Sequence, residues 1–296
     1  MNAFDVKPLS GGVGAEVIGL DLDRPIDAAT ARALNEVWLD AGIVLFRGLG
    51  NSNERHVRLS RCFGELEVHP VPAIRLEGHP EIIRLANKGR TEQMTYRFEG
   101  REVVGRIPWH TDLIYTPATN RGAILRMVEK PAAGGETGWV DTALAYEALP
   151  DSTKARIEGV EGRFGFVVDL REMRFGRPAD LELVDRGNVD YPTFPEVAQP
   201  LVWTHPISGR KSLALSTVHL IDVVGMGREE GDALLTELVD HTLDGRFTYV
   251  HDWEEGDMIL WDNWRTMHMA FGSPPGQQRV VHRTTMAGEH RTGRLL

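Results

Sequence analysis

The chain has 296 residues and a formal net charge of −10, which argues against a nucleic-acid partner, because proteins that bind nucleic acids usually present a basic face. It has no stretch of about 18 uninterrupted apolar residues that would span a bilayer, so we expect no membrane partner. The single cysteine, Cys62, excludes an internal disulfide and a thiolate metal cluster, so a bound metal would need His, Asp or Glu ligands.

The first part of the chain is predicted to contain two strands and two helices. Residues 1–12 lack a basic segment followed by an apolar run, so we expect no secretory leader and a cytoplasmic location. Residues 13–22 alternate like a strand, and residues 28–42 carry apolar positions at helical spacing before a glycine. Residues 43–49 are predicted to form a buried strand, and residues 54–66 a second amphipathic helix.

The rest of the chain is predicted to be rich in short strands. Residues 84–108 are polar and irregular, so we predict a long excursion over the surface. Short apolar runs between Gly and Pro turns follow, with helices near 142–149, 151–158 and 229–243. No repeat or linker divides the sequence, and we predict one domain over residues 1–296. Its predicted class is α+β, mostly β: an antiparallel sandwich or barrel decorated by helices.

His110 and Asp112 are candidate metal ligands, because one residue separates them in the run IPWHTDLIY. In an extended segment, residues i and i+2 point to the same face, so both side chains can bind one ion while Trp109, Thr111 and Leu113 face the other way. A surface histidine beside a solvated aspartate is the alternative interpretation. Among 11 histidines, one such spacing is expected by chance about half the time.

His268 is the third candidate ligand. It follows the apolar run DMILWD and has apolar neighbours, so by itself it is either a hydrogen-bonded core residue or a ligand. With His110 and Asp112 it gives two imidazoles and one carboxylate, the facial set of non-heme iron(II) oxygenases, which leaves coordination positions open. The nearby Asp262 and Asn263 either orient His268 or form a turn.

Two arginines in the strand-like run RVVHRTTM are candidate anion-binding residues. Arg279 and Arg283 share one face of the predicted strand, roughly 13 Å apart at ~3.3 Å per residue, so they can hold two different anions. If that face points inward, each guanidinium needs a partner such as a carboxylate, because an unpaired buried charge is costly. If it points outward, both side chains are simply solvated.

In their order and spacing, these motifs resemble the TauD/TfdA family, the taurine dioxygenase and phenoxyacetate dioxygenase group of iron(II)/2-oxoglutarate enzymes. The resemblance covers nearly the whole chain, through PLSGGVGAEVIGLDL, CFGELEVHPV, WHTDLIYTP, GGETGWVDTALAYEAL, THPISGRKSL, WDNWRTMHMAF and RVVHRTT. It implies a double-stranded β-helix (jelly roll, cupin-like) core, with Fe(II) as cofactor and 2-oxoglutarate and O2 as cosubstrates. It also implies hydroxylation of a small anionic organic substrate (a sulfonate, carboxylate or aryloxyalkanoate), with release of succinate and CO2, in a homo-dimer or homo-tetramer.

The resemblance also assigns roles to individual residues. It implies that His110, Asp112 and His268 are the iron ligands. Arg279, which follows His268 by 11 residues, is implied to bind the distal carboxylate of 2-oxoglutarate with help from Thr137 in GGETGW.

Substrate contacts follow from the same resemblance. Arg283, His69 and the backbone at Leu113 fall where family members hold the anionic head of the substrate. Tyr115 either lines the pocket or belongs to the core.

Two departures from the taurine branch bear on the substrate. Pro72 stands where that branch has a tyrosine, and Arg106 stands where it has an asparagine near the substrate amine. Without those polar partners an ammonium group would be left unpaired, so taurine itself is not the expected substrate. The apolar wall of the pocket is expected from residues 84–108 and 165–200, whose conformation the sequence does not predict.

Two other classes of function use the same three ligands. A metal-dependent hydrolase would activate a water molecule at this site, but nothing in that chemistry requires Arg279 and Thr137. A non-catalytic homologue would keep the fold and the metal without turnover. Oxygen consumption linked to 2-oxoglutarate separates the first of these from a dioxygenase.

Overall fold

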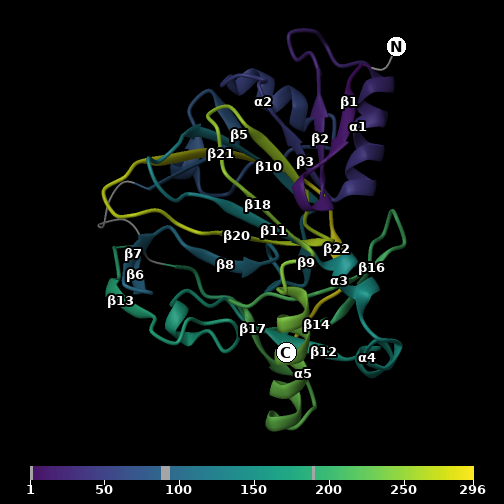
Figure 1. The fold of residues 1–296 in the computed structure, drawn as a ribbon, viewed down its shortest axis with the longest axis vertical. Coiled ribbons are helices and arrows are strands. Elements are labelled where there is room, and N and C mark those ends of the chain that lie inside the picture. Colours follow the sequence, from purple (N-terminus) through teal and green to yellow (C-terminus); the bar gives the residue numbers. More distant parts are fainter. Residues whose placement is uncertain (1–2, 88–93, 189–190) are drawn as a thin grey trace.

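Two β-sheets pack face to face in the computed structural model, which describes residues 3–87, 94–188 and 191–296 (Figure 1). The strands of the larger sheet are β1 (Asp5–Pro8), β2 (Ala15–Ile18), β3 (Ile43–Phe46), β4 (Arg75–Leu76), β5 (His79–Asn87), β10 (Gly122–Glu129), β19 (Met258–Asp262) and β21 (Arg279–Met286). They lie in the order β1-β2-β3-β19-β10-β21-β5-β4, and every pair except β2 with β3 is antiparallel.

The smaller of the two facing sheets carries the candidate ligands His110 and His268. Its strands are β8 (Ile107–His110), β11 (Thr137–Asp141), β18 (Thr248–His251) and β20 (Thr266–Ala270). They lie in the order β18-β11-β20-β8, all antiparallel, so β8 is an edge strand next to β20.

The remaining elements surround these sheets. The other strands are β6 (Thr95–Phe98), β7 (Arg101–Val104), β9 (Ala118–Thr119), β12 (Glu161–Phe164), β13 (Glu182–Asp185), β14 (Val197–Pro200), β15 (Val202–Thr204), β16 (Lys211–Leu213), β17 (Leu220–Val223), β22 (His290–Arg291) and β23 (Arg294–Leu295). The helices are α1 (Ala28–Ala41), α2 (Asn53–Ser60), α3 (Thr142–Ala148), α4 (Asp151–Ile157) and α5 (Arg228–Thr242), with 3-10 turns at Ser10–Gly12, Pro72–Ile74 and Leu170–Glu172.

Alternation along the central strands separates two hydrophobic cores. On β19, Ile259 and Trp261 pack between the two sheets, whereas Met258 and Leu260 pack on the other side, under the N-terminal helices. Successive side chains of a strand point to opposite faces, so a fully apolar strand serves both layers. This is why DMILWD is buried throughout.

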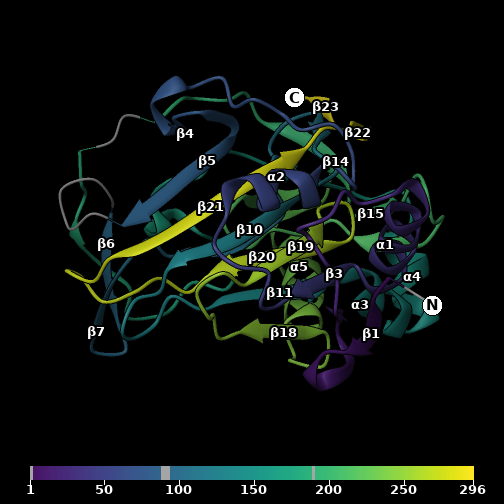
Figure 2. The ribbon, with the colours of Figure 1, turned by 90° about the horizontal axis from the view of Figure 1, so that it is seen from above.

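The N-terminal helices cover the outer face of the larger sheet, where α2 lies over β21 and β10 (Figure 2). The Asp27 side chain accepts a hydrogen bond from the Thr30 N–H at 2.7 Å and starts α1, which ends at Ala41 and is followed by Gly42 at φ 71°. Helices α3 and α5 pack on the outer face of the smaller sheet through a third core. The site is thus held between layers that are each buried on both sides.

The predicted class, a mostly β fold of facing antiparallel sheets decorated by helices, is confirmed. All five predicted helices form, although α2 ends at Ser60 rather than at residue 66. The prediction of an irregular excursion over 84–108 is wrong for the described residues, because β5 continues to Asn87 and β6, β7 and β8 follow; residues 88–93 lie outside the described part. The cause is a tertiary contact: Tyr96 of β6 packs against Leu170 and Met173, which lie far along the chain.

Two other expectations concern the chain as a whole. In the described ranges, no helix combines the length and apolar character needed to cross a membrane. The single domain over residues 1–296 stays a prediction.

Candidate metal centre and cosubstrate site

His110 and His268 are cross-strand neighbours. β8 and β20 pair antiparallel with His268 opposite His110, and their ring centroids lie 4.0 Å apart. Both are buried, and the His268 ring lies 4.8 Å from the ring of Trp261, which belongs to the core between the sheets. Sheet pairing therefore fixes the separation of the two imidazoles.

Asp112 joins the two histidines from a turn. The prediction that the extended segment continues through Asp112 is wrong, because β8 ends at His110 and a turn follows, with Leu113 at φ 60°. The carboxylate still reaches the site: its Oδ1 lies 3.7 Å from Nε2 of His110 and 3.7 Å from Nε2 of His268. One ligand atom from each of the three residues lies within 4.8 Å of the others.

The protonation states of these groups suit a divalent metal. The His110 ring donates Nδ1–H to the Pro108 carbonyl at 2.8 Å, which leaves the Nε2 lone pair for an ion. Burial lowers the pKa of both imidazoles, so they are neutral, as ligands must be. Burial alone would raise the pKa of Asp112, but the charge and the hydrogen bond of Arg283 outweigh it and hold that pKa well below its usual range.

Arg283 lies directly beside this centre. Its Nη2 donates to Asp112 Oδ2 at 2.5 Å, and its guanidinium carbon lies 5.1 Å from the centroid of the Trp261 ring. Of the two orientations that the sequence left open for the arginine face of β21, the inward one is therefore observed. In this structure the anion that Arg283 binds is the candidate ligand Asp112.

Arg279 is the second inward arginine of β21. Its Nε donates to the Gly135 carbonyl at 3.1 Å and its Nη2 to Thr137 Oγ1 at 3.2 Å, while Thr137 also accepts from Trp253 Nε1 at 3.0 Å. Burial lowers the pKa of Arg279 to about 10, and among the described residues no carboxylate forms an ion pair with it. A guanidinium held in this way has N–H groups left for a carboxylate that enters from outside.

The other predicted substrate residues differ in their placement. The Leu113 N–H has no hydrogen-bond acceptor among the described residues, so it is free for an anion. The His69 ring accepts from the Val71 N–H at 3.1 Å, and no hydrogen bond joins it to Arg283 among the described residues. The Arg106 guanidinium lies 4.5 Å from the centroid of the Phe98 ring, and no hydrogen bond or ion pair joins it to the three ligands among the described residues.

Tyr115 belongs to an aromatic cluster beside the metal centre, which we define as Tyr115, Phe166, Phe194 and His219. The Tyr115 ring lies 4.8 Å from Phe166, 5.1 Å from Phe194 and 4.7 Å from His219. The His219 ring lies 6.5 Å from that of His110, and burial lowers its pKa to about 3. Phe194 is 39% exposed, so the cluster extends from the ligand histidine to the surface.

Sequence reasoning missed most of this cluster, and it also missed Glu67. Phe166 and Phe194 come from the segment 165–200 and carry no local signal. Glu67 donates its N–H to the Thr285 carbonyl at 2.9 Å, and partial burial raises the pKa of its carboxyl, on which the charges of Arg283 and Asp112 also act. Glu67 thus joins β21 through its backbone, and its carboxyl lies within electrostatic range of Arg283.

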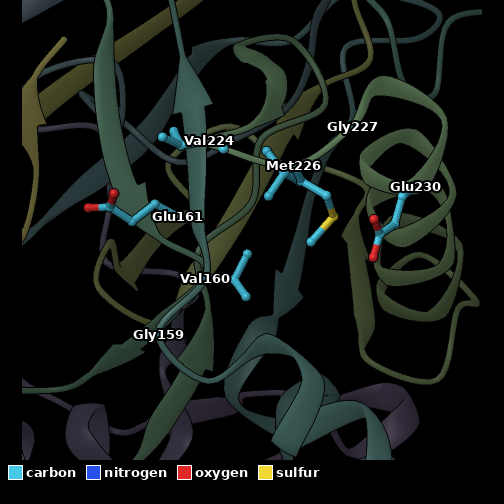
Figure 3. Close-up of a pocket in the computed structure, with 9 residues that line it drawn as sticks. Gly159, Val160, Glu161, Val224, Met226, Gly227 and Glu230 are labelled. Atoms are coloured by element: carbon cyan, nitrogen blue, oxygen red, sulfur yellow. The ribbon is translucent and has the colours of Figure 1, made fainter.

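A surface pocket lies elsewhere, between the start of β12, the end of β17 and the start of α5 (Figure 3). It measures about 420 Å³, and none of its lining residues is a candidate ligand, an inward arginine or a member of the aromatic cluster. Glu161 points away from Met226 and Glu230 in Figure 3 and pairs with Arg294. This pocket therefore offers no set of converging polar groups, and we do not assign it a function.

Comparisons with known proteins agree with this geometry. The family model "Taurine catabolism dioxygenase TauD, TfdA family" matches residues 5–285. The chain is 30% identical to an (S)-phenoxypropionate/alpha-ketoglutarate-dioxygenase of Sphingobium herbicidovorans, over 97% of this chain and 96% of that protein. It is also 30% identical to an alpha-ketoglutarate-dependent sulfate ester dioxygenase of Pseudomonas putida, over 97% of this chain and 90% of that protein. A taurine dioxygenase structure from Burkholderia xenovorans matches with a TM-score of 0.78 and 29% identity, over 99% of this chain and 95% of that one.

Proposed function

Because this chain belongs to the TauD/TfdA family and is a 2-oxoglutarate-dependent dioxygenase, we propose that its metal is Fe(II), held by His110, Asp112 and His268, and that it hydroxylates a small anionic organic substrate. The observation that carries the proposal is the convergence of these three side chains beside two inward arginines. Two imidazoles and one carboxylate with open positions are typical of non-heme Fe(II) oxygenases.

Neither alternative function finds support. The relatives described above are dioxygenases, and a hydrolase has no use for the second guanidinium. The intact ligand set, with neutral imidazoles and an ionised carboxylate, also argues against a non-catalytic homologue.

Arg279 and Thr137 are proposed to bind the distal carboxylate of 2-oxoglutarate. The Thr137 hydroxyl and the Gly135 carbonyl fix the guanidinium from one side, so its remaining N–H groups form a rigid, planar fork. Such a fork matches a carboxylate in bidentate geometry. Bound Fe(II) would supply the oxygen chemistry, in which 2-oxoglutarate and O2 give succinate and CO2 while a substrate C–H bond becomes C–OH.

Arg283 is proposed to hold the anionic head of the substrate, together with the Leu113 N–H and with His69 as a third candidate. Arg283 is bonded to Asp112 Oδ2, so a substrate anion that shares this guanidinium is placed next to the ligand carboxylate. The reactive carbon then lies close to the metal centre, and the gain in rate comes from positioning. Tyr115 and the rest of the aromatic cluster supply an apolar wall for the carbon skeleton. Arg106, whose guanidinium lies over the Phe98 ring, stays a candidate for a further substrate contact.

The names of the relatives bear on the substrate class. They act on a phenoxypropionate and on sulfate esters, which combine an anionic head with an organic body. The proposed site has a matching group for each part: a guanidinium for an anionic head and an aromatic wall for an organic body. Location in the cytoplasm stays a prediction from the sequence, and assembly into a dimer or tetramer stays a prediction from the family resemblance.

A substrate panel tests the proposal. Purified protein with Fe(II), 2-oxoglutarate and O2 is incubated with aryloxyalkanoates, alkylsulfonates and alkyl sulfate esters, each beside a neutral amide or alcohol analogue. We expect at least one anion to stimulate succinate formation and O2 consumption in equal amounts, and its neutral analogue to fail. If no anion stimulates succinate formation while Fe(II) and 2-oxoglutarate demonstrably bind, the proposed substrate class is wrong.

A further inference from the structure

Asn263 is fully buried in the turn that joins β19 to β20. Its backbone N–H donates to the Arg121 carbonyl at 3.2 Å, which fixes the start of this turn. β20 begins at Thr266 and carries His268, so the residues of the turn lead directly into a metal-ligand strand.

The side-chain amide of Asn263 binds the backbone of Asp112 on both sides of its α-carbon. Oδ1 accepts from the Asp112 N–H at 2.9 Å, and Nδ2 donates to the Asp112 carbonyl at 3.1 Å. Nδ2 also contacts the Asn120 carbonyl at 3.2 Å and Asn120 Oδ1 at 3.1 Å. The amide thus pairs with Asp112 as a neighbouring strand would, at a position where the sheet has ended.

Asp112 needs such support, because no strand ladder holds it. The next residue, Leu113, has φ 60°, a conformation that is unfavourable for a residue with a branched side chain unless the surroundings impose it. Arg283 binds Oδ2 of the same carboxylate from another direction. With a free backbone, the carboxylate could follow the guanidinium away from the imidazoles.

We propose that Asn263 is a positioning residue for the metal centre: it clamps the Asp112 peptide groups and thereby couples the carboxylate ligand to the turn that leads to His268. From the sequence, Asn263 either orients His268 or forms a turn. Its side-chain contacts instead show it bound to the backbone of Asp112. The inference rests on the metal centre proposed above. Groups that orient a ligand in this way affect metal affinity about 10- to 100-fold.

The test compares metal affinity between two amide deletions. Mn2+ is titrated into wild type, Asn263→Ala and Asn35→Ala, with binding followed by the electron paramagnetic resonance signal of free Mn2+. Asn35 is the matched control, because its Nδ2 also donates to two backbone carbonyls, those of Ala31 and Cys62, in the N-terminal helical layer. We expect Asn263→Ala to bind Mn2+ at least about tenfold more weakly, and Asn35→Ala to bind it as wild type does.

Further measurements keep the result decisive. The thermal midpoint of each metal-free protein reports folding, and a purely structural amide would lower it without changing the affinity of the molecules that remain folded. If Asn263→Ala does not fold, Asn263→Ser replaces it, because its hydroxyl is too short to bridge both peptide groups of Asp112. Equal Mn2+ affinity in a folded Asn263 variant overturns this inference alone. Absence of Mn2+ binding by wild type overturns the metal centre itself, and this inference with it.

Discussion

Replacing Arg279 by Gln should weaken 2-oxoglutarate binding severely while leaving the metal centre intact. A guanidinium has five N–H groups, and Arg279 uses Nε–H for Gly135 and one Nη2–H for Thr137, so three remain for a carboxylate. Loss of one partner of a buried, hydrogen-bonded charge pair costs about 2–5 kcal/mol. At about 1.4 kcal/mol per factor of ten, the Kd of 2-oxoglutarate should rise between about 30-fold and about 4,000-fold.

The assay is calorimetric titration of 2-oxoglutarate into the Mn2+-loaded protein, with Arg283→Gln as the control on the same face of the same strand. Pyruvate, a 2-oxo acid without a distal carboxylate, sharpens the result. Wild type and Arg279→Gln should bind pyruvate equally, because the lost contact involves only the far end of the cosubstrate. A change below about threefold in the Kd of 2-oxoglutarate, or an equal loss for both acids, would refute the assigned role of Arg279.

Four further changes test other parts of the structure. Asp112→Ala should abolish Mn2+ binding and succinate formation, and retained turnover would contradict the ligand assignment. Arg283→Gln should raise the KM of an active anionic substrate at least about 30-fold, from a loss of about 2 kcal/mol, with an unchanged KM for 2-oxoglutarate; steady-state kinetics with each varied separately decide this. Phe166→Ala should raise the KM of bulky substrates by about two- to twelvefold, from about 0.5–1.5 kcal/mol of aromatic contact, and an equal effect on the smallest active substrate would argue against a pocket wall. His282→Gln should reduce the loss of stability at acid pH. Burial and Arg126 lower the pKa of folded His282 from 6.5 to about 4, so the unfolded chain binds a proton at a higher pH than the folded protein does. The free energy of unfolding of wild type therefore falls by up to about 3 kcal/mol as the pH falls from 6.5 to 4. Urea unfolding at pH 7 and pH 4.5 measures this loss, and identical losses in both proteins would exclude His282 as its source.

The sequence located the site residues better than it described their backbone. The alternation rule placed Arg279 and Arg283 on one face, and that face points inward because both guanidiniums find oxygen partners there. The same rule failed at Asp112, since it assumes a strand. Here the chain turns at Leu113, and an amide that is distant in sequence takes over the pairing that a strand would have supplied.

The aromatic wall and the strands between residues 84 and 108 could not be predicted for a related reason. Their local sequence is polar or irregular, and what orders them is contact with segments far along the chain. Tyr96 packs with Val218, and Phe166 packs with Tyr115. Such pairings leave no periodic signal within either segment, so only the three-dimensional arrangement shows them.

The pairing of His110 with His268 has a consequence for how this fold is held closed. β8 is the last strand of its sheet, and one side of it has no neighbour among the strands that the structure describes in that sheet. An ion bound by both imidazoles would link this edge strand to β20, since a ligand that binds only the native arrangement stabilises that arrangement. Amide hydrogens along β8 should then exchange with deuterated solvent more slowly in the metal-loaded protein. The metal centre would in that case also protect the edge of the sheet against local unfolding.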